Sequence, residues 1–236
     1  PLLVLADRMA DERAGRCWSL QLVYSGAFRA EVERDQYDQI RAQMGLGEEA
    51  FGYPLDPGES IVAPEVIMSF SAEGLARLSQ QLHEVIRTRV CRGYWRDRER
   101  PVLLNSWEAF YMDFTGEDIV GMARQAADLG IDLLVLDDGW FSDRNDDTKA
   151  LGDWWVNEEK LGCDLGELIR RVNGLGVSFG IWMEPEMVSE KSELFRAHPD
   201  WALAIPGKHP VLGRDQLVLD LSRTEVVDAL FEQICS

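Results

Sequence analysis

The stretch Ile131-Asp-Leu-Leu-Val-Leu-Asp-Asp-Gly-Trp140 is a short apolar strand that ends on two adjacent carboxylates. A buried carboxylate without a partner is costly, so Asp137 and Asp138 need one at the strand end. Ligands bind at the carboxyl ends of parallel strands in α/β folds, which makes a polar substrate one candidate. Gly139 lets the chain turn, and Trp140 adds an apolar face. An acidic helix cap or a salt-bridged loop explains the motif equally well, because Asp-Asp-Gly is common in turns.

The composition is that of a globular protein with an acidic balance of charges. The 236 residues are 46% apolar, which is ample for a sizeable core, and they carry a net charge of −18 with a pI near 4.5. Nucleic acids and anionic membranes require a basic patch, so neither is an expected partner. A neutral or cationic ligand fits the charge better.

The cysteines and the N-terminal residues point to neither a special site nor a targeting segment. The four cysteines lie far apart without a Cys-x-x-Cys pair, so we expect reduced thiols rather than a zinc site or a disulfide framework. No stretch approaches the roughly 18 apolar residues of a membrane span, and the beginning shows no signal segment. We expect a cytoplasmic protein.

The first part of the chain is predicted to be β-structure. Short apolar runs alternate with turn signals up to about residue 70, as in Trp18–Tyr24 and Phe28–Val32. Ser71 is then expected to cap a helix whose apolar residues fall on one face. This helix would link the β-structure to the rest of the chain.

From Pro101 onwards, strand and helix patterns alternate, which is typical of a parallel sheet. The expected strands are Val102–Leu104, Ile131–Leu136, Val177–Met183 and Leu217–Asp220, each followed by a helix or a polar loop. The sequence therefore predicts four βα units. A (β/α)8 barrel takes about 250 residues, and only about 135 follow Pro101, so a complete barrel cannot fit. The sheet is either an open one with four strands or the front part of a longer structure.

Carboxylates, tryptophans and a guanidinium gather at the ends of these predicted strands. They are Trp107 and Glu108, Asp137 and Asp138, Trp182, Glu184 and Glu186, and Arg214 just before the fourth strand. Sugar hydroxyls form hydrogen bonds with charged groups, and the apolar face of a pyranose stacks on indole, so the set predicts a sugar site. A phosphate site would need a Gly-rich loop and a lysine. We expect no metal, because no histidine stands near the acids and Asp-x-Asp spacing is absent.

Several motifs together resemble the bacterial α-galactosidases of glycoside hydrolase family 36. They are Asn105-Ser-Trp-Glu-Ala109, Leu136-Asp-Asp-Gly-Trp-Phe141, Phe179-Gly-Ile-Trp-Met-Glu-Pro-Glu-Met-Val-Ser189 and Arg214-Asp-Gln-Leu-Val-Leu-Asp-Leu-Ser-Arg223, with Ser19-Leu-Gln-Leu-Val-Tyr-Ser-Gly26 and Arg96-Asp-Arg-Glu-Arg-Pro101 upstream. The likeness runs in order along nearly the whole chain. It implies an α/β protein with an N-terminal β-sandwich remnant at 1–72, a linking helix and linker at 73–100, and the first half of a (β/α)8 TIM barrel, with four βα units, at 101–236.

The resemblance also implies an activity and a set of residue roles. The whole protein would be a retaining α-galactosidase of carbohydrate metabolism, which removes terminal α-linked galactose from oligosaccharides such as raffinose and melibiose without a cofactor. Asp137 and Asp138 would bind the galactose hydroxyls at carbons 4 and 6, Trp107 and Trp182 would shape the pocket, and Arg214 would line it. We expect a homo-oligomer at full length.

The resemblance assigns no catalytic residue to this chain. The nucleophile of the family lies in a Lys-Trp-Asp motif and its acid/base is a later aspartate, and neither motif occurs here. We therefore expect the 236 residues alone to be inactive. A related retaining α-glycosidase or transglycosylase, such as an α-N-acetylgalactosaminidase, and a non-catalytic carbohydrate-binding fragment stay open as alternatives.

Other conspicuous side chains favour roles outside the chemical step. Glu184 and Glu186 share a face but straddle a proline at one strand end, and neighbours on one strand cannot readily flank a scissile bond. We expect both to bind substrate or to support neighbouring loops rather than to act as the catalytic pair. Trp154 could contact a second sugar from a loop or pack under it. The acidic residues Asp143, Asp146, Asp147 and Asp153 are most simply a solvated loop, because the spacing of a calcium loop is missing.

Overall fold

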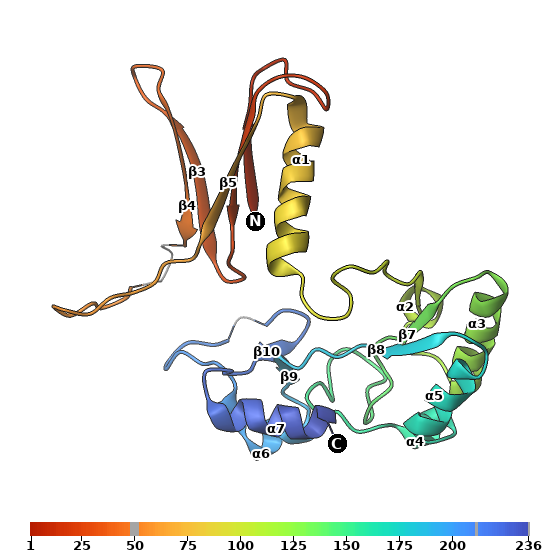
Figure 1. Cartoon of the computed structure of the whole chain (residues 1–236). Helices are drawn as coiled ribbons and strands as arrows, with labels where there is room; N and C mark the ends of the chain where they lie inside the picture. Colours follow the sequence, from red (N-terminus) through yellow and green to blue (C-terminus); the bar gives the residue numbers. More distant parts are fainter. Residues whose placement is uncertain (48–51, 211, 236) are drawn as a thin grey trace. The chain divides into compact units, whose positions relative to one another are not determined.

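The structure is a computed structural model that describes residues 1–47, 52–210 and 212–235. The chain divides into two compact units, Pro1–Glu99 and Arg100–Ser236 (Figure 1). Among the described residues, no helix combines the length and the apolar character needed to cross a bilayer.

The first unit contains two antiparallel arrangements of strands. β1 (Leu2–Ala6), β2 (Cys17–Leu22) and β5 (Val66–Ser71) form one sheet in the order β1-β2-β5. β3 (Phe28–Arg34) and β4 (Ile40–Leu46) form a hairpin. β2 and β3 lie where the alternation of apolar and polar residues predicted strands, because such alternation places one face of a sheet on the core.

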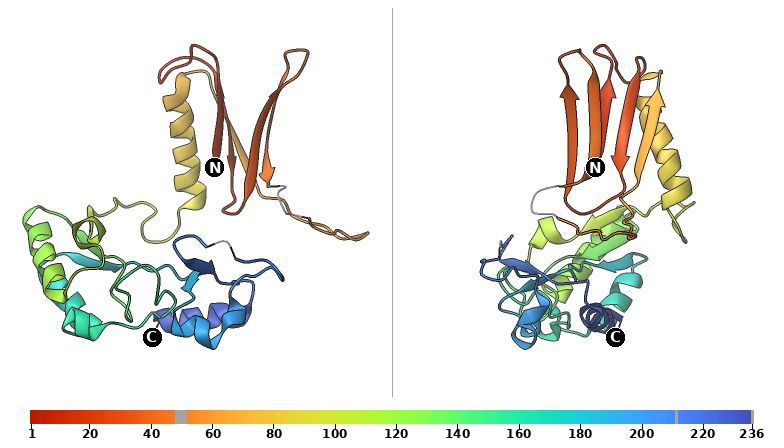
Figure 2. Two further views of the ribbon diagram at one scale, coloured as in Figure 1. Left: turned by 180° about the vertical axis from the view of Figure 1, so that it is seen from behind. Right: turned by 90° about the vertical axis from the view of Figure 1, so that its left-hand side faces the viewer.

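Helix α1 (Gly74–Val85) packs against β5 and β2 through the buried Leu78 and Leu82, and a π-helical turn (Ile86–Val90) follows it. Figure 2 shows α1 along one face of the three-stranded sheet and the β3–β4 hairpin on the other side. The predicted helix cap at Ser71 is wrong. Ser71 is the last residue of β5, and its hydroxyl accepts a hydrogen bond from the Glu73 amide (3.0 Å) before the helix begins.

The second unit is built on a parallel sheet. β6 (Leu103–Asn105), β7 (Leu133–Leu136) and β8 (Ser178–Ile181) are parallel and lie in the order β6-β7-β8. α3 (Gly116–Asp128) and α5 (Leu165–Asn173) pack on each other and on the sheet. The strand and helix alternation that the sequence predicted after Pro101 is therefore present for three strands.

Short helices complete the second unit, and several begin with side-chain caps. Thr115 and Asp118 form a reciprocal capping box at the start of α3. The remaining elements are α2 (Trp107–Phe110), α4 (Glu158–Leu161), α6 (Glu193–Ala197), a 3-10 turn (Pro199–Trp201) and α7 (Thr224–Cys235). The core beneath them includes the fully buried Ile119, Leu134, Leu136, Leu168, Val172 and Val226.

The predicted fourth parallel strand is wrong. The run at Leu217–Asp220 lies in β10 (Gln216–Val218) and just beyond it, and β10 pairs antiparallel with β9 (Met187–Ser189). Within the described residues, the parallel sheet has three strands. An apolar run of three residues, Leu217–Leu219, does not determine its own partner, and β9, which follows β8 closely, offers an edge for the returning chain.

Candidate functional site

The side chains predicted to share one rim do follow neighbouring parallel strands. Asp137 directly follows β7 and Trp182 directly follows β8, while Trp107 begins α2 two residues after β6 ends at Asn105. The Trp182 amide donates to the Leu136 carbonyl (2.8 Å), which continues the pairing of β7 and β8 up to the rim. Because the strands are parallel, all three residues lie at the same edge of the sheet.

Asp137 joins the ends of β6 and β7. Its Oδ2 accepts a hydrogen bond from Asn105 Nδ2 (2.6 Å), and its Oδ1 accepts one from the Asp138 amide (2.8 Å). Its own amide donates to the Ser106 hydroxyl (3.1 Å). The carboxylate is half-buried, so its orientation is fixed while part of it faces solvent. Each carboxylate oxygen can accept more than one hydrogen bond, and this leaves acceptor capacity for a ligand hydroxyl.

Asp138 is buried and forms an internal ion pair. Arg144 Nε donates to Asp138 Oδ1 (3.0 Å) and Nη2 donates to Oδ2 (2.8 Å), while neither side chain is exposed by more than 3%. Arg144 Nη1 also donates to the Lys149 carbonyl (2.8 Å). The salt-bridged loop that the motif allowed is therefore present at Asp138. Arg144 was missed by sequence reasoning, although a cation six residues after Asp138 was a usable signal.

Lys160 holds together two of the loops that follow the strands. Its ammonium donates to the carbonyls of Met112 (2.5 Å) and Gly139 (2.9 Å) and lies 4.4 Å from the centre of the Phe114 ring. Burial lowers the pKa of Lys160, and the charges of Asp113 and Asp138 oppose that shift. Sequence reasoning missed this lysine too, because its partners are backbone carbonyls distant in sequence.

Glu184 is a further carboxylate near the rim, three residues beyond the end of β8. Burial raises the pKa of Glu184, with the positive charge of Arg214 opposing the shift and the negative charges of Glu186 and Asp138 adding to it. In the described part of the chain, Glu184 Oε2 is buried without a hydrogen-bond partner. Arg214 is exposed, in a turn where it and Asp215 both have positive φ, 55° and 57°. Arg214 is thus close enough to influence Glu184 electrostatically.

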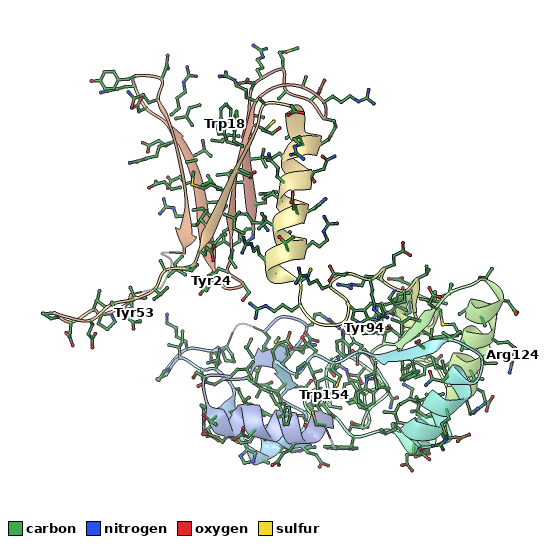
Figure 3. The ribbon with its side chains drawn as sticks, viewed as in Figure 1. Trp18, Tyr24, Tyr53, Tyr94, Arg124 and Trp154 are labelled. Carbon is green, nitrogen blue, oxygen red and sulfur yellow. The ribbon has the colours of Figure 1, made fainter. Side chains whose placement is uncertain are left out.

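Trp182 belongs to an aromatic cluster with Trp140, Phe141 and Trp154. Trp154 lies 4.5 Å from Phe141 and 6.2 Å from both Trp140 and Trp182, measured between ring centroids. Trp140 Nε1 donates to the Trp182 carbonyl (2.9 Å). Figure 3 shows Trp154 in the interior of the second unit, so of its two predicted roles the structure supports packing under the loop.

The acidic loop after the rim is only partly solvated. Asp143, Asp146 and Asp147 are exposed, as predicted, but Asp153 is buried. Its two carboxylate oxygens accept hydrogen bonds from the Glu193 amide (2.9 Å) and the Leu194 amide (3.0 Å) at the start of α6. Burial raises the pKa of Asp153, and these two hydrogen bonds oppose the shift. The prediction of a solvated position was wrong for Asp153, because α6 needs acceptors for its first amides.

An open hollow of about 910 Å³ lies beside Trp107. Tyr111 lines it as well, and its ring packs edge-on against Trp107 with the centroids 5.2 Å apart. The backbone of Tyr111 has a positive φ of 49°, which is unfavourable for an aromatic residue. No group of three or more His, Cys, Asp or Glu side chains in the described ranges could hold a metal ion.

Comparisons with known proteins agree with this geometry. Residues 60–236 match the family model named Melibiase, and residues 1–56 match the Glycosyl hydrolase family 36 N-terminal domain. The family models assign the chain to the glycoside hydrolases, and its fold is consistent with part of an α/β protein. The chain belongs to the melibiase family, and the predicted resemblance to α-galactosidases of glycoside hydrolase family 36 is confirmed.

Relatives of this chain are longer proteins. This chain is 57% identical over 235 residues to a bifunctional alpha-galactosidase/sucrose kinase, AgaSK, from Mediterraneibacter gnavus. The match covers 100% of this chain and 25% of that protein. The chain is 52% identical to alpha-galactosidase AgaA from Geobacillus stearothermophilus, over 99% of this chain and 32% of the relative. The crystal structure of AgaA superposes with a TM-score of 0.94, covering 99% of this chain and 33% of that one. The chain therefore spans between a quarter and a third of the length of these relatives.

Proposed function

We propose that this chain is part of a retaining α-galactosidase that removes terminal α-linked galactose from oligosaccharides such as raffinose and melibiose. The observation that carries the proposal is the convergence of Trp107, Asp137 and Trp182 at one edge of a parallel sheet, in a chain that belongs to the melibiase family. The solved complexes of AgaA with raffinose and with stachyose support an oligosaccharide as the substrate class.

The finer architecture and the residue roles belong to the same proposal. The first unit would be a β-sandwich remnant, and β6, β7 and β8 would be the first strands of a (β/α)8 barrel. Asp137 and Asp138 would accept hydrogen bonds from the galactose hydroxyls, Trp107 and Trp182 would shape the apolar side of the pocket, and Arg214 would line it. The hollow beside Trp107 and Tyr111 offers room for the sugars that follow galactose.

The reaction itself would require groups that lie outside this chain. Retaining hydrolysis uses two carboxyl groups about 5 Å apart, one as nucleophile and one as acid/base. The family resemblance places both in a later part of the protein, so this chain contributes recognition and orientation of the sugar. A homo-oligomer and the absence of a cofactor are further parts of the proposal.

The test is an assay of the longer protein that contains this chain with p-nitrophenyl α-galactoside, beside the 236 residues alone. We expect hydrolysis by the longer protein and none by the shorter one, because the shorter one has no route to a covalent glycosyl intermediate. The α-N-acetylgalactosaminide serves as the matched substrate. Preference for it would favour the related glycosidase, and no hydrolysis of either substrate would favour a binding fragment.

The acid pair gives a second test of the proposal. Loss of a charge-assisted hydrogen bond in a desolvated pocket costs on the order of 1.5–3 kcal/mol, so Asp137→Ala, which keeps both members of the buried Arg144–Asp138 pair, should lower kcat/KM of the longer protein at least tenfold. Unchanged kcat/KM in Asp137→Asn and Asp138→Asn would return both acids to a structural role. Hydrolysis by the 236 residues alone, abolished by Glu184→Gln, would move the chemistry itself into this chain.

A further inference from the structure

Arg144 is the largest side chain that is completely buried in the described part of the protein. Three of its guanidinium nitrogens are used: Nε and Nη2 on the Asp138 carboxylate, and Nη1 on the Lys149 carbonyl. The side chain thus folds back from its loop to the end of β7. A planar guanidinium that binds a carboxylate with two donors fixes the position and the rotation of that carboxylate.

Stability alone does not account for this pair. Removing two opposite charges from water costs roughly as much as their attraction returns, so a buried ion pair adds little net stability compared with apolar residues. The pair lies directly at the rim, next to the Asp137 carboxylate. The Asp138 amide donates to Asp137 Oδ1 (2.8 Å), so any movement of Asp138 also shifts Asp137.

We propose that Arg144 is a positioning residue for the sugar site, which acts by holding the Asp138 carboxylate and, through the Asp138 backbone, Asp137. This inference rests on the proposed function, since it assumes that the acid pair binds galactose. Arg144 itself does not touch the sugar. Its bond to the Lys149 carbonyl anchors the loop, so the loop and the acid pair keep one fixed arrangement.

The experiment compares Arg144→Lys with Arg170→Lys in the longer protein. Arg170 is a suitable control because it is exposed on α5 and pairs only with its neighbour Glu167 among the described contacts. Lysine keeps the charge at position 144 but loses the two-donor geometry. We expect kcat/KM for p-nitrophenyl α-galactoside to fall at least tenfold in Arg144→Lys, mainly through KM, and to stay unchanged in Arg170→Lys.

A double-mutant cycle with Asp138→Asn separates positioning from a merely structural role. If Arg144 acts through Asp138, the loss in Arg144→Lys/Asp138→Asn should be no larger than the loss in Asp138→Asn alone, because coupled residues are not additive. Additive losses, or Arg144→Lys kinetics equal to those of Arg170→Lys, would overturn the proposal.

The remaining outcomes are also decisive. If Arg144→Lys does not fold, the uncharged pair Arg144→Gln/Asp138→Asn is compared with Asp138→Asn, and a further loss of tenfold or more in kcat/KM rejects the proposal. If the unsubstituted protein does not hydrolyse α-galactosides, the proposed function fails and this inference fails with it. If the unsubstituted protein is active and Arg144→Lys leaves kcat/KM unchanged, only this inference is rejected and the proposed function stands.

Discussion

The two three-stranded sheets of this chain bury their side chains very differently. In the β1-β2-β5 sheet, α1 covers one face, while Trp18 (40% exposed), Met68 (76%) and Phe70 (48%) stay accessible on the strands. In the β6-β7-β8 sheet, Leu134 and Leu136 are completely buried. Antiparallel sheets can leave one face open, whereas parallel sheets are covered on both sides in complete folds. The comparison separates a unit whose apolar side chains stay partly exposed on the sheet face opposite α1 from a unit that has its own core and places acids at its strand ends.

The largest effect is expected in the core of the second unit. Leu134→Ala removes a fully buried side chain from β7 and should cost about 2–5 kcal/mol, because a cavity is left where the structure cannot collapse. Amide hydrogen exchange of β7 and β8 in the longer protein measures the local free energy of opening. Leu129→Ala, at a 77% exposed position in the same unit, is the control and should change this value by less than about 0.5 kcal/mol. A loss below about 1 kcal/mol at Leu134 would contradict the assigned core.

The second effect concerns the open face of the first unit. A contiguous exposed apolar face marks a surface that another part of a protein covers. If the β-sandwich proposal holds, Phe70 is buried in the longer protein, and Phe70→Ala should cost about 3 kcal/mol in the exchange of β2 and β5 amides. Tyr37→Ala, in the turn between β3 and β4 and 74% exposed, should have little effect. Equal, small losses at both positions would show that the face stays open and would count against the sandwich.

These regions also show how far the sequence could predict the structure. The strands β2, β7 and β8 were predictable because their periodicity and turn signals are local, and the rim at Trp107, Asp137 and Trp182 followed from the parallel arrangement. The partner of β10 was not predictable, because pairing depends on which edge is free in space. Ser71 has the residue type of a helix cap, but the ladder with β2 takes it into the strand.

The polar contacts of the site were the least predictable part. Lys160 binds backbone carbonyls, which carry no sequence signal, and Asp153 caps a helix that begins 40 residues later. The Arg144–Asp138 pair spans only six residues, but a charge in an acidic loop is normally solvated. In each case the outcome depended on burial, and burial follows from the tertiary structure rather than from local pattern.

A third prediction compares the two ends of β7. Asp137→Asn removes the charge at the carboxyl end of the strand, and Asp132→Asn does the same before its amino end, where Asp132 accepts a hydrogen bond from the Val102 amide. If ligands bind only at the carboxyl end, Asp137→Asn should lower kcat/KM by about tenfold or more, which corresponds to about 1.4 kcal/mol, and Asp132→Asn should leave it unchanged. Steady-state kinetics with p-nitrophenyl α-galactoside measure both. Similar losses at both ends would reject the assignment of the rim.

The smallest effect is expected at Asp153, and it should depend on pH. Burial raises the pKa of Asp153 in the folded protein, so the folded state binds its proton more tightly than the unfolded state does. Stability should therefore fall as pH rises from the ordinary value near 3.8 to the raised folded pKa, and then stay level. The asparagine in Asp153→Asn does not titrate, so the stability of this variant does not fall over that pH range. The variant also loses one hydrogen-bond acceptor for the first amides of α6, which costs about 1 kcal/mol. We expect Asp153→Asn to be less stable than the unsubstituted protein at pH 4 and to recover part of the difference at pH 7, as measured by the exchange of α6 amides. A difference that grows with pH would show that the two backbone hydrogen bonds outweigh the cost of burying the charge.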